Sequence, residues 1–101
     1  MSSDFSMTVM QEEKSLKIQI RGNLDGSAAQ QLRYTLCQYI DRFPLIQINT
    51  DGVFYVEPFG LNLLRYNLEA MRRSTEQFSF TGNHASVFQP LFNRIIQYVA
   101  L

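Results

Sequence analysis

The feature of this sequence that most constrains its fold is a change of hydrophobic period along the chain. Leu16–Arg21 alternates apolar and polar residues strictly, which is the pattern of a β-strand with one buried face. From Ala29 to Phe43 the apolar residues instead recur every three or four positions, as they do in an amphipathic helix. This change of period predicts strands that alternate with helices, and therefore a sheet with helices packed on it.

The other segments extend this pattern to the order ββαβαβα. Alternating or β-branched runs predict strands over residues 7–11, 16–21, 45–50 and 77–81, with an extended segment over residues 53–56. A second helix is expected from Pro58, and a third in the C-terminal tail with Pro90 near its start. A final strand from Ile95 is the alternative for that tail.

Glycine and proline residues predict where these elements end. Gly22 is expected to end the second strand, and Asp51-Gly52 to turn the chain after the third. Pro44 is expected to stop the first helix, because proline disfavours a helical conformation in the residue before it. Strands that alternate with helices imply parallel pairing. We therefore predict an α/β fold with a mainly parallel sheet of four to five strands and helices packed against it.

Length and charge narrow the possible functions. The 101 residues fit a single domain spanning residues 1–101, and 46% of them are hydrophobic, which is enough for a buried core. Nine Lys or Arg residues balance nine Asp or Glu residues, which argues against a nucleic-acid partner, since binding phosphates requires basic side chains. No apolar stretch approaches the ~20 residues of a membrane helix, and the N-terminus lacks a signal-peptide pattern. We expect a cytoplasmic domain without direct membrane insertion.

Residues with catalytic or metal-binding chemistry are scarce. The chain has one cysteine, Cys37, and one histidine, His84, which are too few for a Cys/His metal site. Its five glycines form no nucleotide-binding loop, and no serine lies in a hydrolase elbow. We interpret Cys37 as a small packing residue and His84 as a cap or surface residue. We expect no catalytic residue, no cofactor and no metal, and a small enzyme is the least favoured hypothesis.

Two carboxylates stand out by position. Asp25 and Glu57 each precede a predicted helix, at the same end of successive strand–helix connections. They could form an acid–base pair, but helix capping and the helix dipole explain each one separately. On the second helix, Glu69 lies four residues after Arg65, a spacing that favours an ion pair on a solvated helix face.

The segments Gly22–Leu32 and Gly52–Leu61 carry a family resemblance. The first segment is similar to the pattern Gly-Glu-Leu-Asp, followed by two variable residues and Thr-Ala at a helix start. The second is similar to the pattern Gly-Val, followed by three residues and Asp-Ser-Ser/Thr-Gly-Leu. Both patterns are signatures of the STAS domain, the sulfate-transporter and anti-sigma-factor-antagonist family. Gly82-Asn83 and the residues after it are similar to the approach to that family's third helix. The resemblance covers roughly residues 7–94, and it implies a fold with the order of elements predicted above.

The resemblance implies a bacterial, cytoplasmic regulator of transcription that signals by binding an anti-sigma factor with a serine-kinase fold. In such antagonists the kinase phosphorylates the serine after the aspartate of the second signature, which separates the two proteins. Here Glu57 stands at the aspartate, Pro58 at the serine and Phe59 at the next residue. Proline has no hydroxyl group, so phosphorylation at position 58 is impossible. If control persists, we expect it to use another hydroxyl, such as Thr50 or Ser27, or the abundance of the partner alone.

The predicted partner-binding surface lies where the two signatures meet. It consists of Asp25, Ser27, Glu57, Pro58, Phe59 and Gly60. Pro58 would stiffen the helix start, and the Phe59 ring would supply an apolar anchor for a protein partner. The alternative is that Phe59 and Tyr55 face the core, since aromatic rings are commonly buried. Similar single STAS domains bind the ATPases of ABC-type lipid transporters, so an accessory subunit of such a transporter is the alternative function.

Overall fold

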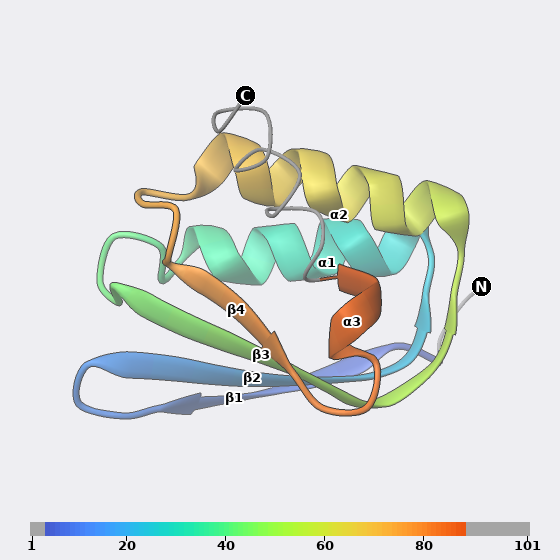
Figure 1. The fold of residues 1–101 in the computed structure, drawn as a ribbon, viewed down its shortest axis with the longest axis horizontal. Helices are drawn as coiled ribbons and strands as arrows, with labels where there is room; N and C mark the ends of the chain where they lie inside the picture. Colours follow the sequence, from blue (N-terminus) through green and yellow to red (C-terminus); the bar gives the residue numbers. More distant parts are fainter. Residues whose placement is uncertain (1–3, 89–101) are drawn as a thin grey trace.

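The computed structural model describes residues 4–88, which form a sheet covered on one face by helices (Figure 1). In chain order the elements are β1 (Ser6–Gln11), β2 (Ser15–Leu24), α1 (Gly26–Cys37), β3 (Leu45–Val56), α2 (Pro58–Met71), β4 (Phe78–Thr81) and α3 (Ala85–Phe88). The predicted order is confirmed as far as β4. The helix expected near Pro90, and its alternative strand from Ile95, lie outside the described residues.

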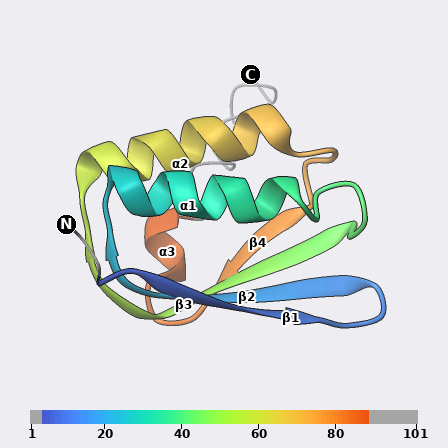
Figure 2. The same ribbon diagram turned by 180° about the vertical axis from the view of Figure 1, so that it is seen from behind.

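The sheet has four strands in the order β1-β2-β3-β4. β1 pairs antiparallel with β2, whereas β2–β3 and β3–β4 are parallel. Both parallel connections move the same way across the sheet, and such crossovers are almost always right-handed. α1 and α2 therefore lie on the same face, as Figures 1 and 2 show from opposite sides. The predicted mainly parallel sheet with helices packed against it is confirmed.

β2 supplies the centre of the core and shows why the alternating pattern forms a strand. Leu16, Ile18 and Ile20 are buried, while Lys17 and Gln19 between them are exposed on the other face of the sheet. The helices bury apolar residues against this core, namely Ala28, Ala29, Leu32, Leu36, Leu64 and Leu68. Each fully buried aliphatic side chain contributes about 1.5–3 kcal/mol by leaving water, so this layer holds the sheet and helices together.

α1 ends at Cys37, well before Pro44, so the expected end of the first helix is wrong. The apolar spacing continues past the helix because Ile40 and Phe43 are still buried, although they lie in the turns that follow. Cys37 itself is exposed, which corrects its interpretation as a packing residue. A helical spacing of apolar residues thus marks burial here, not helix length.

The buried side chain of Gln77 holds the turns after α1 in place. Its Nε2 donates to the carbonyl oxygens of Ile40 and Phe43, at 2.8 Å each. Its Oε1 accepts from the backbone N–H of Arg73 at 2.7 Å. Buried backbone groups need such partners, because each unpaired group costs about 1–3 kcal/mol. One amide therefore connects the end of α2, the start of β4 and the chain after α1.

β3 runs unbroken from Leu45 to Val56, so the expected turn at Asp51-Gly52 is wrong. The pairing with β2 instead shifts register twice, and each shift inserts one extra residue into β3. Gly22 also lies within β2 and does not end it. Its φ of +95° favours glycine, and an added Cβ would lie 2.0 Å from the carbonyl oxygen of Asp4.

Removing the Gln77 amide tests its role in the fold. We expect Gln77→Met, which keeps the length of the side chain but none of its hydrogen bonds, to lower the free energy of unfolding by about 2–4 kcal/mol. Gln19→Met, on the exposed face of the sheet, is the matched control and should change it by less than about 0.5 kcal/mol. Urea denaturation measures both, and equal effects would contradict the assignment.

Candidate functional site

The candidate site lies where β2 and β3 end and two helices begin. Leu24 and Val56, the last residues of the two strands, are partners in the parallel register. The backbone N–H of Glu57 then donates to the carbonyl oxygen of Leu24 at 3.0 Å. Because the strands are parallel, their carboxyl ends meet at one edge of the sheet, and α1 and α2 start side by side there (Figure 1).

Gly60 allows the start of α2 to approach the first connection closely. A Cβ added at Gly60 would lie 2.6 Å from the carbonyl oxygen of Leu24 and from the carbonyl carbon of Asp25. Both atoms belong to the backbone, which has little room to yield. Gly60 is accordingly buried. Of the six predicted binding residues, it is therefore the one that lies below the surface and positions the others.

The two predicted capping carboxylates behave differently. Asp25 Oδ1 accepts from the N–H of Ala28 at 2.9 Å, which confirms Asp25 as the cap of α1. Glu57 occupies the corresponding position before α2 but makes no capping hydrogen bond, so its predicted capping role is wrong. Glutamate is not among the residues that commonly cap, which carry shorter side chains. Neither carboxylate forms an ion pair within residues 4–88.

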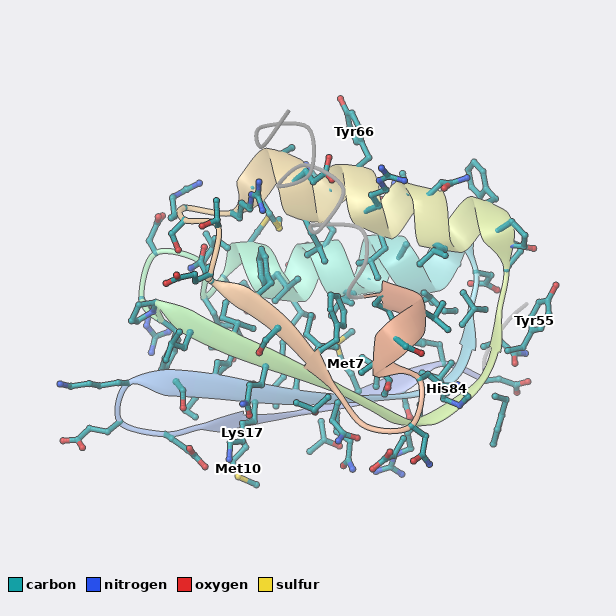
Figure 3. All side chains as sticks on the ribbon, in the orientation of Figure 1. Met7, Met10, Lys17, Tyr55, Tyr66 and His84 are labelled. Atoms are coloured by element: carbon teal, nitrogen blue, oxygen red, sulfur yellow. The ribbon has the colours of Figure 1, made fainter. Side chains whose placement is uncertain are left out.

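The aromatic residues at this edge point outward. Phe59 is 65% exposed and Tyr55 is 58% exposed, so the alternative in which both face the core is wrong. In Figure 3 the Tyr55 side chain extends away from the body of the fold. The Phe59 ring lies over the first turn of α1, since a Cβ added at Gly26 would be 2.7 Å from its Cε2.

Phe54 is a further exposed aromatic residue that the sequence analysis did not single out. It is 81% exposed. Gly22 and Asn23 pair with Val53 and Tyr55, so Phe54 is the extra residue at the second register shift of β3. The shift turns two consecutive aromatic side chains outward, which a simple alternating strand would not do. In the sequence, Val53–Val56 are four apolar residues in a row, a pattern that does not predict which of them are exposed.

We refer to the exposed residues Ser27, Phe54, Tyr55, Pro58 and Phe59, together with the half-buried carboxylates Asp25 and Glu57, as the junction surface. Pro58 is exposed and begins α2, as predicted. Ser27 is exposed in the first turn of α1. Aromatic rings and two carboxylates are thus presented together where β3 ends and α1 and α2 begin.

Thr50, the other hydroxyl considered for phosphorylation, is fully buried. Its Oγ1 donates to the carbonyl oxygen of Thr81 at 2.8 Å and accepts from the N–H of His84 at 3.0 Å. A kinase cannot reach a side chain held in this way, so the expectation for Thr50 is wrong. His84 is half-buried just before α3, consistent with its predicted place at a loop–helix junction.

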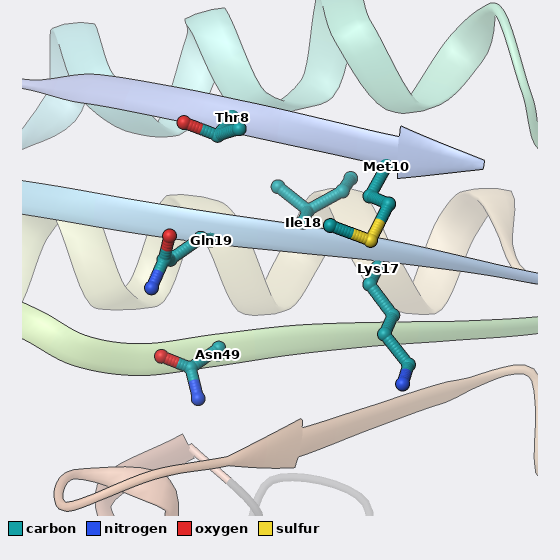
Figure 4. A pocket seen from close by; sticks show the side chains of 6 residues that line it. All are labelled: Thr8, Met10, Lys17, Ile18, Gln19 and Asn49. Atoms are coloured by element: carbon teal, nitrogen blue, oxygen red, sulfur yellow. The ribbon is translucent and has the colours of Figure 1, made fainter. Parts of the chain in front are cut away.

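Other parts of the described chain offer less chemistry. The exposed face of the sheet has a shallow hollow of about 220 Å³ between Met10, Lys17, Gln19 and Asn49 (Figure 4). Within residues 4–88, no three His, Cys, Asp or Glu side chains gather as a metal site would require. No helix in this range is long and apolar enough to span a membrane.

The outer face of α2 carries the predicted ion pair. Arg65 Nε lies 3.7 Å from Glu69 Oε2, at the expected spacing of four residues. Partly exposed pairs of this kind contribute only a few tenths of a kcal/mol. The predicted ion pair is therefore present, but the predicted solvated face is wrong here, because both side chains are half-buried and Glu69 Oε2 is buried.

Two solved structures have a fold similar to that of this chain. A crystal structure of an anti-sigma factor antagonist from Mycobacterium paratuberculosis has a TM-score of 0.66 and 18% identity, over 97% of this chain and 85% of that one. The anti-sigma factor antagonist SpoIIAA in its unphosphorylated form has a TM-score of 0.55 and 22% identity, over 84% and 81%. No family model and no curated protein matches the sequence. The predicted STAS-like fold is confirmed by these structures.

The different capping of the two helices can be tested by substitution. We expect Asp25→Ala to lower the free energy of unfolding by about 0.5–2 kcal/mol, because the Ala28 N–H loses its acceptor. Asp25→Asn retains an acceptor and should have little effect. Glu57→Ala is the matched control at the second helix and should change stability by less than about 0.5 kcal/mol. An equal loss in the two alanine variants, measured by urea denaturation, would contradict this account.

Proposed function

We propose that this chain is a regulatory module that binds a protein partner through the junction surface, in the manner of an anti-sigma factor antagonist, and catalyses no reaction. The observation that carries the proposal is the exposure of Phe54, Tyr55 and Phe59 beside Asp25 and Glu57. Three largely exposed aromatic rings at one edge of the sheet are what an interaction surface would present. The fold shared with two proteins named as anti-sigma factor antagonists supports the same function.

The partner that fits this surface combines an apolar recess with basic side chains. Phe59 lies against the first turn of α1, so little conformational freedom remains for it to lose on binding. Aromatic anchors that enter a pocket supply much of the affinity in protein interfaces. The carboxylates of Asp25 and Glu57, which form no ion pair within residues 4–88, would attract Arg or Lys residues around that recess. We propose an anti-sigma factor or another protein with a serine-kinase fold as this partner, in the cytoplasm.

Regulation at the usual position is not available to this chain. Pro58 begins α2 and has no hydroxyl that a kinase could modify. We propose that binding is controlled by the abundance of the partner or by modification of Ser27. Ser27 is exposed and lies in the first turn of α1, where a phosphate would add nearly two negative charges to the junction surface.

Substitution of Phe59 tests the proposed surface. A partner captured from lysate of the source organism on the immobilised chain would be identified by mass spectrometry, purified and titrated calorimetrically. We expect Phe59→Ala to raise the dissociation constant at least about tenfold, because it removes the central apolar anchor. Tyr66→Ala is the matched control, since Tyr66 is a 71% exposed aromatic residue farther along the same helix (Figure 3).

The outcomes separate the hypotheses. Unchanged affinity in both Phe59→Ala and Asp25→Ala would remove the junction surface from consideration. A captured transporter ATPase whose binding depends on Phe59 would leave the surface intact and replace the anti-sigma role with the accessory-subunit role. Turnover of a small metabolite by the purified chain would overturn the proposal that it performs no reaction.

A further inference from the structure

Among the described strands, β1 forms one edge of the sheet. Within residues 4–88, β2 is the only strand that pairs with it, over all six positions from Ser6 to Gln11. Every second backbone N–H and C=O of such a strand points away from the sheet. These groups form a template on which another extended chain can pair.

β1 lacks the features by which proteins usually protect such an edge. Its sequence, Ser6–Gln11, contains no charged residue and no proline. Its pairing with β2 has no register shift that would twist the edge away. Short strands, edge charges, prolines and bulges are the common means of preventing strand addition. The opposite edge differs, since β4 has only four residues.

A hollow next to this edge would receive the side chains of an added strand. It has a volume of about 420 Å³ and is lined by Met7 of β1 and by Ser27, Gln30, Gln31, Tyr34 and Thr35 of α1. α1 lies on the β1 side of the helical layer, as Figures 1 and 2 show. A strand added beside β1 would direct alternate side chains toward the helical layer, and therefore toward this hollow.

We propose that the occupant of this edge is β1 of a second copy of the chain, paired antiparallel about a two-fold axis. Met7 and Val9 are the residues of β1 that face the helical layer, where they pack partly buried against the core. A second β1 would therefore offer two apolar side chains to the hollow. The hollow offers these side chains an apolar contact with Met7 and with the ring of Tyr34, which is 71% exposed.

Symmetry and charge also favour a second copy. Matching faces require residues of the same parity to oppose one another. The two such registers that pair most of β1 place Thr8 opposite Thr8, or Val9 opposite Val9. No like charges meet in either register because β1 is uncharged, and the chain as a whole has a formal net charge of zero. The two sheets would join into one continuous sheet, with both copies of α1 on the same face. This inference does not depend on the proposed function.

Charge placed on the edge tests the inference. Sedimentation of the wild-type chain over about a hundredfold range of concentration should show a monomer–dimer equilibrium. Thr8 is exposed, and in either register the two residue-8 side chains lie opposite or diagonal to each other. Thr8→Lys should therefore raise the dimer dissociation constant roughly tenfold, because like charges on paired strands repel. An equimolar mixture of Thr8→Lys and Thr8→Glu should restore the dimer.

The matched control is Gln19→Lys. Gln19 lies opposite Thr8 on β2 and is exposed on the same face. In the dimer the two Gln19 residues are three strand spacings apart, about 14 Å, which exceeds the screening length of about 8 Å at physiological salt. This variant should dimerise like the wild type. A wild type that stays monomeric throughout, or a dimer unaffected by Thr8→Lys while circular dichroism shows an intact fold, would overturn the inference.

Discussion

The parallel pairing of β2 with β3 is the constraint on which the rest of this structure depends. It brings the ends of both strands to one edge, where Leu24 and Val56 are register partners and the Glu57 N–H donates to the Leu24 carbonyl. α1 and α2 must then start next to each other. Gly60 completes the arrangement, since any larger residue would meet the backbone of Leu24 and Asp25. The geometry of the junction surface is therefore set by backbone, not by flexible side chains.

A surface built in this way is well suited to binding. Its aromatic residues are held on helix starts and on a shifted strand, so a partner meets a prearranged shape. Its two carboxylates differ, since Asp25 accepts a hydrogen bond from the Ala28 N–H and the Glu57 side chain makes no capping hydrogen bond. Under the proposed function, Pro58 offers no hydroxyl for phosphorylation at the start of α2. The same fold can thus act as a binding module whose contact is controlled elsewhere.

Much of the fold follows from local sequence patterns. The alternation in Leu16–Arg21 predicted a strand with one buried face, and Pro58 predicted a helix start, because both depend on the residues of one element. The end of α1 could not be predicted in this way. The chain that follows α1 is held by Gln77, far along the sequence, whose amide donates to the carbonyls of Ile40 and Phe43. No local pattern contains that contact.

The candidate site was predictable in position but not in composition. Capping chemistry placed Asp25 at the start of α1, and the signature spacing placed Phe59 near it. Phe54 was missed because its exposure results from a register shift between two strands. Glu57 was predicted to cap α2, but its side chain makes no capping hydrogen bond. Its position before a helix does not determine the geometry of its side chain. Contacts between distant segments, not propensities, decide such details.

Amide hydrogen exchange of the chain, alone and with its partner, tests the central claim most directly. The account predicts that protection on binding is concentrated in residues 25–28 and 54–61, with little change over the exposed face of β2. Exchange reports the local opening of backbone hydrogen bonds, so it locates the contact without any substitution. Protection confined to the exposed face of the sheet, with both helix starts unchanged, would contradict the account.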